Sequence, residues 1–233
     1  TGLGVEPRNI TMCDVDELAV ADAKARWFPG ITVLHDDILN VVKNKKYSGG
    51  AWLMINYDTC APLRDDTPDN VLKLAMNVEE NGILCCWFLA GRENGGTMED
   101  IKAMEGLLRD CLTDKAIKSL KIPKDILDDR MPYIARALLL DNNINTKLAP
   151  HGCHTRLIRI WTYTSTDVVE GKIGSPMVVV MCQLRKGKSK VARGLVEDQV
   201  TTAIQHSHFI VVGDCRKRLG QKAIEEKYGN LFD

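Results

Sequence analysis

The chain has 233 residues, of which 45% are hydrophobic and 27% are charged, and its formal net charge is zero. A chain of this length can bury one substantial core but leaves little room for a second full domain. Its longest apolar runs, such as residues 82–91, reach about half of the roughly 20 residues that a membrane-spanning helix needs, and its start does not resemble a signal peptide. We therefore expect a single intracellular domain over residues 1–233, cytoplasmic or nuclear, with no membrane segment.

The eight cysteines form no CxxC pair, and several lie inside apolar runs. A free thiol in such a run behaves as a small hydrophobic group, so we expect reduced cysteines in a reducing compartment. His151, Cys153 and His154 are close together in the sequence, but a fourth ligand at a suitable spacing is missing. The sequence therefore predicts no metal site.

Apolar runs of strand length alternate with segments of helical periodicity, which favours an α/β sheet with helices on both faces and mostly parallel strands. In chain order, the pattern predicts a strand over 9–13, a helix over 16–28, strands over 31–34 and 51–57, a helix over 68–80 and a strand over 82–89. Helices over 97–112 and within 126–140 follow, separated from the next strand by a polar, loop-like stretch. We interpret residues 94–150 as an insertion in front of the last strands.

The last part of the chain contains two β-rich runs, residues 156–163 and 177–184. The connection between them is too short for a crossover helix with two loops, so these strands should be antiparallel neighbours. A helix over 191–205, a strand over 208–213 and a helix over 216–228 complete the pattern, which then holds seven strands.

The most informative stretch is Ile-Thr-Met-Cys-Asp-Val-Asp-Glu at residues 10–17, followed by a helix and by Ile-Thr-Val-Leu-His-Asp-Asp-Ile-Leu at residues 31–39. These motifs resemble class I S-adenosylmethionine-dependent methyltransferases, which fold as a Rossmann-like three-layer sandwich with a seven-stranded, mostly parallel sheet and a late antiparallel pair. The resemblance implies that Asp14, with Val15, binds the ribose hydroxyls of the cofactor. It also implies that Asp37 approaches the adenine amino group, with Ile38 beside the ring. A carboxylate suits both tasks because it accepts hydrogen bonds from hydroxyl and amino groups.

Asp58 is the candidate catalytic residue that the resemblance implies, because the next strand of the family ends at the catalytic edge of the sheet. It would face the methyl donor or the methyl acceptor. Residues 58–61 read Asp-Thr-Cys-Ala and depart from the Asp/Asn-Pro-Pro-Tyr/Phe motif of enzymes that methylate amino groups of bases. The alternative interpretation of Asp58 is a helix cap for the segment that follows.

The family has a first strand, a glycine-rich loop and a helix before the acid-tipped strand, whereas nine residues precede Ile10 here. We expect strand 208–213 to supply the first strand, in the central position between the strands that end at Asp14 and Asp58. The domain would then be circularly permuted, with the helix–strand–helix of residues 191–233 completing the sheet. Gly213 and Asp214 would form the cofactor loop, in front of a helix N-terminus that receives the cofactor carboxylate. The rival interpretation is a basic helical appendage that faces DNA.

The charge is unevenly distributed, because residues 1–100 contain 16 acidic and 9 basic residues and the remainder contains 15 and 22. Two basic clusters could bind the phosphates of a nucleic acid. They consist of Arg185, Lys186, Lys188, Lys190 and Arg193, and of Arg216, Lys217, Arg218 and Lys222. No stacking platform for bases can be recognised among the 4 Trp, 5 Tyr and 4 Phe residues.

The leading hypothesis is an enzyme that transfers a methyl group from S-adenosylmethionine, with nucleic acid as a candidate acceptor. A nicotinamide dehydrogenase also carries an acid at the end of its second strand. A third hypothesis is a catalytically inactive methyltransferase fold that binds nucleic acid or a protein partner. The methyl acceptor cannot be read from the sequence, and we expect region 94–150 to determine it, because loops at the carboxyl edge of such sheets carry function.

Overall fold

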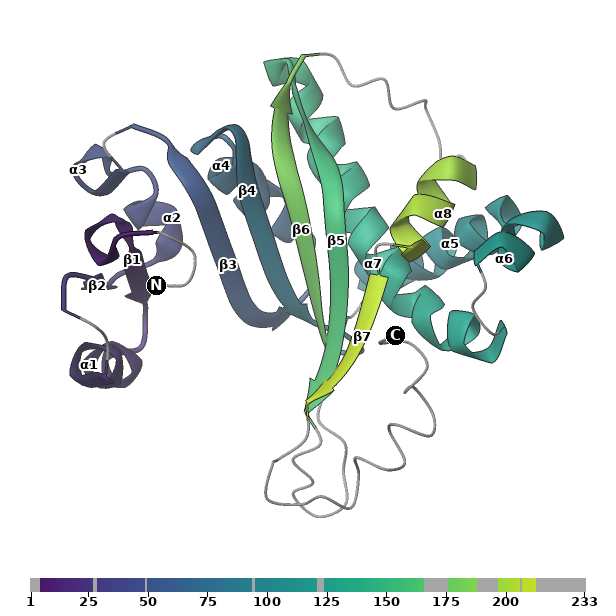
Figure 1. Ribbon diagram of the computed structural model, residues 1–233, viewed down its shortest axis with the longest axis horizontal. Helices are drawn as coiled ribbons and strands as arrows, with labels where there is room; N and C mark the ends of the chain where they lie inside the picture. Colours follow the sequence, from purple (N-terminus) through teal and green to yellow (C-terminus); the bar gives the residue numbers. More distant parts are fainter. Residues whose placement is uncertain are drawn as a thin grey trace.

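The computed structural model describes residues 5–26, 29–48, 50–93, 95–120, 124–165, 176–187, 197–205 and 207–212. Within these residues the protein is an α/β fold with seven strands, the number that the sequence predicts. The strands are divided between two sheets, however. Figure 1 shows a small two-stranded sheet at one end of the molecule, beside the first strand of a five-stranded sheet.

The small sheet consists of two short parallel strands with a helix between them. In chain order, the elements are η1 (Pro7–Asn9), β1 (Thr11–Asp14), α1 (Glu17–Arg26), β2 (Thr32–His35), α2 (Ile38–Val41) and α3 (Lys45–Ser48). Ile38 and Leu39 of α2 pack against the main hydrophobic core. The carbonyl of Val42 accepts a hydrogen bond from Nε1 of Trp52 at 3.3 Å. Helix α2 and the residue after it therefore attach the small sheet to the large one.

The large sheet has the strand order β3-β4-β6-β5-β7. Its strands are β3 (Trp52–Pro62), β4 (Val78–Leu89), β5 (Cys153–Ser165), β6 (Met177–Lys186) and β7 (Ser207–Val212). The pairs β3–β4 and β5–β7 are parallel, whereas β6 is antiparallel to both of its neighbours. The antiparallel pairing of the two late strands, expected from their short connection, is confirmed.

The predicted position of the last strand is wrong. We expected residues 208–213 between the strand of Asp14 and the strand of Asp58, but β7 lies at the opposite edge of the large sheet, next to β5. The reason is that α8 (Glu197–Gln205) ends two residues before β7, and its buried Val200 and Ile204 pack into the core on the side of β5. The strand must therefore begin beside β5, and the circular permutation is not supported. Gly213, Asp214 and the helix expected over 216–228 lie outside the described residues.

The helices after β3 form the other half of the core. They are α4 (Thr67–Ala75), α5 (Gly95–Cys111), α6 (Asp114–Leu120), α7 (Lys124–Leu148) and the short η2 (Ala149–His151). Helix α7 continues through the stretch that we expected to be a loop, because Ile144 and Leu148 are buried and extend its apolar stripe. Two polar residues of α7 form hydrogen bonds with Thr155 of β5. Asn145 Oδ1 accepts the backbone N–H of Thr155 at 2.7 Å, and Asp141 Oδ1 accepts the hydrogen of the Thr155 hydroxyl at 2.6 Å. Asp141 and Asn145 thus form a tertiary contact with β5 and do not form a turn.

The two faces of the large sheet differ, because side chains alternate along each strand. The covered face packs against α4, α7 and α8, and α5 packs against α7. In Figure 1, α4 and α7 lie behind the sheet and α5 and α8 lie beside it, beyond β5. Its central residues are Leu84, Cys86, Phe88, Ile160, Val178, Val180 and Cys182. On the other face, which we call the open face, no described helix packs, and Asn56, Asp58, Arg156 and Arg159 are exposed. In its described part the large sheet thus has two layers instead of the predicted three.

Candidate functional site

Asp14 lies at the end of β1, as expected, and its side chain is exposed. One carboxylate oxygen, Oδ1, accepts the backbone N–H of Asp16 at 2.8 Å and so shapes the turn into α1. The second oxygen has no hydrogen-bond donor among the described residues. It is therefore available to a ligand, and the exposed side chain of Val15 lies next to it in the turn.

Asp37 follows β2 and is the N-cap residue of α2, where Oδ1 accepts the N–H of Leu39 at 2.7 Å. Its second oxygen also lacks a donor in the described part of the chain. Ile38, for which the resemblance implies a position beside an adenine ring, is half-buried and packs against the core. Both aspartates therefore shape a turn with one oxygen and present the other.

The two carboxylates lie in the same neighbourhood, at the carboxyl edge of the small sheet. The pKa of Cys13 is raised to about 11, mainly by burial and further by the negative charges of Asp37, Asp36 and Asp14. Burial also raises the pKa of Tyr57 in β3, and the charge of Asp37 contributes to that shift. An acidic group thus lies between the small sheet and the first strand of the large one. It would attract a ligand that presents hydroxyl or amino hydrogens.

Asp58 lies inside β3, four residues before its end, and not at a helix N-terminus. The helix-cap interpretation is therefore wrong, since α4 begins at Thr67 and Asp66 is its N-cap residue. The Asp58 side chain is exposed on the open face, and Asp58 lies opposite Trp87 in the pairing of β3 with β4. Beside this pair, Oδ1 of Asn56 accepts a hydrogen bond from Nε1 of Trp87 at 2.5 Å.

The open face carries an aromatic layer that the sequence does not predict. Trp87 in β4 and Trp161 in β5 both pair with Val179 of the strand between them. Tyr163 meets Trp87 edge to face across that strand, with ring centroids 5.8 Å apart and the planes at 71°. Together they flank Val179, which is only 1% exposed although no described helix covers this face. Alternation along each strand could have revealed the set only once the order of β4, β6 and β5 was known.

Most of the predicted basic residues cannot be placed, because Lys188, Lys190, Arg193, Arg216, Lys217, Arg218 and Lys222 lie outside the described residues. The two that can be placed already have partners. Arg185 donates to the side-chain oxygen of Asn81, and Nζ of Lys186 lies 3.9 Å from a carboxylate oxygen of Glu80. Two other arginines, Arg156 and Arg159 in β5, are exposed on the same face without a carboxylate partner in the described part of the chain.

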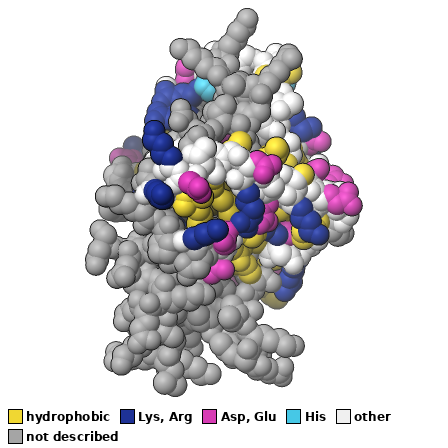
Figure 2. Space-filling view, turned by 90° about the vertical axis from the view of Figure 1, so that its right-hand side faces the viewer, with side chains coloured by type: hydrophobic (Ala, Val, Ile, Leu, Met, Phe, Trp, Pro, Cys, Tyr) yellow, Lys and Arg dark blue, Asp and Glu magenta, His cyan; other side chains and the backbone are white. Residues whose placement is uncertain are grey.

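The end of the molecule formed by α5, α6 and α8 has a different surface. Figure 2, which looks onto this side, shows basic and acidic side chains next to one another. Arg109 illustrates this pattern, because it forms ion pairs with both Glu105 and Asp128. Among the described residues of this end, neighbouring charges of opposite sign give no extended positive field, so these residues are poor candidates for binding a polyanion.

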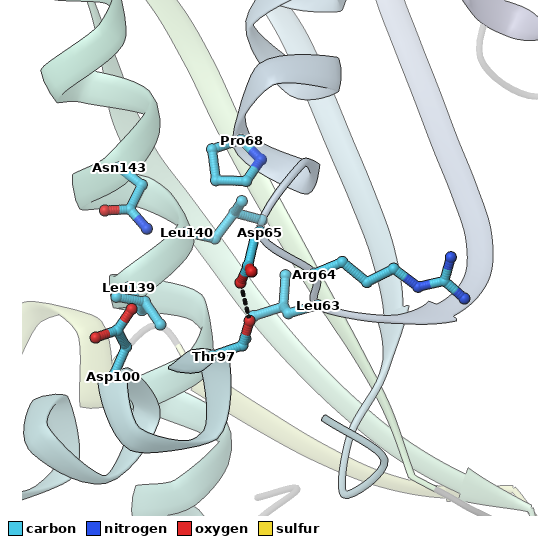
Figure 3. A pocket seen from close by; sticks show the side chains of 9 residues that line it. All are labelled: Leu63, Arg64, Asp65, Pro68, Thr97, Asp100, Leu139, Leu140 and Asn143. Atoms are coloured by element: carbon cyan, nitrogen blue, oxygen red, sulfur yellow. Dashed lines mark hydrogen bonds between the residues drawn. The ribbon is translucent and has the colours of Figure 1, made fainter. Parts of the chain in front are cut away.

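A cavity of about 260 Å³ lies between α4, α5 and α7, beyond the end of β3 (Figure 3). Asp65, Thr97, Asp100 and Asn143 contribute polar groups to its wall, and the Thr97 hydroxyl donates to Asp65 at 2.6 Å. The side chain of Arg64 points away from the others in Figure 3. The cavity is smaller than the roughly 300–1,000 Å³ typical of pockets for drug-sized ligands. It lies among the helices, apart from Asp58 on the opposite face.

Searches against known proteins do not identify the chain. No family model matches it, and no curated protein matches its sequence. Among the described residues, no helix is long and apolar enough to cross a membrane, and no group of three or more His, Cys, Asp and Glu side chains is arranged to hold a metal ion. Function must therefore be inferred from the residues themselves and their arrangement.

Proposed function

We propose that this chain is a methyltransferase domain that binds S-adenosylmethionine at the carboxyl edge of its small sheet. The observation that carries the proposal is the pair of aspartates on adjacent parallel strands, Asp14 and Asp37. Each offers one carboxylate oxygen that is free of donors in the described part of the chain. The arrangement suits the two hydroxyls of a ribose and the amino group of an adenine, which all need acceptors.

The order of the strands also supports the proposal. The family to which the sequence is similar has a late antiparallel pair, and β6 is antiparallel to both β4 and β5. The family also has one more strand between the acid-tipped strand and the next parallel one. Among the described residues, β1 pairs only with β2 and β3 only with β4, so the facing edges of both strands are unpaired.

The described residues fit the adenosine half of the cofactor. Gly213 and Asp214, predicted to hold its amino-acid half, lie outside the described residues and directly follow β7 at the opposite edge of the large sheet, so they are not part of the proposed site. When bound, S-adenosylmethionine would supply the methyl group, while the chain would orient the acceptor and exclude water. Asp58 would act on the acceptor side, from the exposed face of β3.

Calorimetry with S-adenosylhomocysteine tests the proposal. We expect a dissociation constant in the micromolar range, about −8 kcal/mol. The variants Asp14→Asn and Asp37→Asn keep the oxygen that shapes each turn but replace the other with an NH2 donor. Each should weaken binding by about 1.5–3 kcal/mol, because a donor then faces a donor. Asp22→Asn, on the exposed side of α1, removes the same charge and should bind like the wild type.

Failure of the wild-type protein to bind the ligand at millimolar concentration would contradict the assignment. Wild-type affinity in both Asp14→Asn and Asp37→Asn would move the ligand away from this edge. Full binding without any methyl transfer would favour the second candidate function, a catalytically inactive methyltransferase fold that binds nucleic acid or a protein partner. The exposed polar and aromatic side chains of the open face favour that second candidate.

A further inference from the structure

The open face of the large sheet combines two kinds of side chain that seldom remain exposed together. Its centre is the aromatic layer of Trp87, Trp161 and Tyr163, all partly exposed. Its β5 side carries Arg156 and Arg159, both exposed. Exposed aromatic rings that share a surface with cations typically mark a binding surface and not a solvated face.

The charge of this face has one sign over its β5–β6 half. The sequences of β5 and β6 contain no aspartate or glutamate; alternation places Arg156, Arg159 and Arg185 on the open face and Lys186 on the other. Arg185 contacts Asn81, and Lys186 contacts Glu80. The cations that remain available to a ligand are therefore Arg156 and Arg159. The guanidinium of Arg159 also lies 5.7 Å from the ring centre of Trp161, which places a cation directly at the aromatic layer.

We propose that the open face binds single-stranded nucleic acid, with bases stacked on Trp161 and its aromatic neighbours and with phosphates on Arg156 and Arg159. Stacking on aromatic rings along a positively charged surface is how proteins bind single strands without sequence preference. A duplex hides its bases and could use only the two arginines. An apolar protein surface would bury both arginines without counter-charges, which is costly.

This proposal is independent of methyl transfer, because it uses β4, β5 and β6 and none of the residues assigned to the cofactor. The nucleic acid would cross the sheet between β5 and β4. Asp58 pairs with Trp87 at the far side of this path. A bound strand would therefore pass the candidate catalytic residue, whether or not the chain transfers a methyl group to it.

Fluorescence anisotropy with labelled single strands of about 12 nucleotides, either oligo(dT) or oligo(U), tests the proposal with the full chain. We expect binding that weakens with salt. The double variant Arg156→Ala/Arg159→Ala should reduce the slope of log K against log salt by about 1.4, since each lost phosphate contact on a single strand removes about 0.7. The control Arg26→Ala/Arg109→Ala removes the same charge from α1 and α5 and should leave that slope unchanged.

Trp161→Ala should lower the affinity about 10- to 100-fold, and Trp161→Phe should restore most of it. Thermal unfolding of each variant separates loss of binding from loss of fold. If Trp161→Ala does not fold, the exposed arginine pair still decides the question. The proposal is overturned if the wild type does not bind at low salt, or if the arginine pair and its control bind alike. It is also overturned if a duplex or polyglutamate competes as well as the single strand, because the face would then bind any anion or an acidic protein.

Discussion

Cys85 and Cys86 are neighbours in β4 and are almost equally hidden, with exposed fractions of 2% and 4%. The two side chains, however, have different surroundings. Cys86 points into the core beneath the helices, together with Leu84 and Phe88. Cys85 points to the open face, where its neighbours are side chains of the sheet itself, among them Trp87 and Met181.

The difference shows that a low exposed fraction does not by itself identify the core of this protein. On the covered face, burial is made by whole helices that are joined to the sheet through many residues. On the open face, the described neighbours of Cys85 are side chains of the same layer of strands. Contacts of the first kind should dominate stability, and those of the second kind should serve binding.

Replacing an arginine should give the largest difference in stability between the two faces. Arg136 in α7 is buried and forms a two-point ion pair with Glu93, Nε to Oε1 at 2.6 Å and Nη2 to Oε2 at 2.9 Å. Replacing it with methionine leaves the Glu93 carboxylate buried without a counter-charge and should cost about 3–5 kcal/mol in urea unfolding. Arg159→Met on the open face should change stability by less than about 0.5 kcal/mol. Equal effects would contradict the comparison.

The same ion pair should make stability depend on pH. Burial alone would raise the pKa of Glu93, but hydrogen bonds, above all from Arg136, outweigh it, and the pKa lies below its usual value of 4.5. A carboxyl group whose pKa is lower in the folded state contributes stability above its unfolded pKa, and this contribution is lost as the pH falls through the folded value. Unfolding measured from pH 7 to pH 3 should therefore show a steeper loss in the wild type than in Glu93→Gln/Arg136→Met.

Replacing two adjacent aromatic residues should give a smaller difference in the loss of stability. Phe88 is 2% exposed beneath the helices, and Phe88→Ala should cost about 3–5 kcal/mol because a cavity remains in the core. Trp87→Ala, on the open face, should cost about 1–2 kcal/mol despite the larger side chain, since water can replace the ring. Thermal and urea unfolding of the two variants measure the difference. A larger loss for Trp87→Ala would show that the open face is part of the folding core.

The smallest effect concerns the reactivity of the two thiols. Burial raises the pKa of Cys85 to about 11 and raises that of Cys86 further. The thiolate is the reactive form, so alkylation of Cys85 by iodoacetamide should accelerate about tenfold per pH unit between about pH 8 and pH 10. Cys86 should react more slowly at each pH, because a helix must move to uncover it. Fragment ions in mass spectrometry distinguish the two residues, and identical rates would remove the distinction between the faces.

The local pattern of the sequence determines much of this protein. It predicts the seven strands, because apolar runs of strand length are visible without knowledge of their partners. It also predicts the antiparallel pairing of β5 with β6, since their connection is short. The closeness of Asp14 and Asp37 follows from two parallel strands joined by one helix.

Tertiary structure alone decided the remaining features. The edge position of β7 depends on where α8 packs, which no local period encodes. The length of α7 depends on Asp141 and Asn145, whose polarity predicts a loop until Thr155 provides their partner. The aromatic layer joins residues of β4 and β5 across β6. Periodicity shows which side chains avoid water, but only the packing of distant segments shows whether a helix, a neighbouring side chain or a ligand covers them.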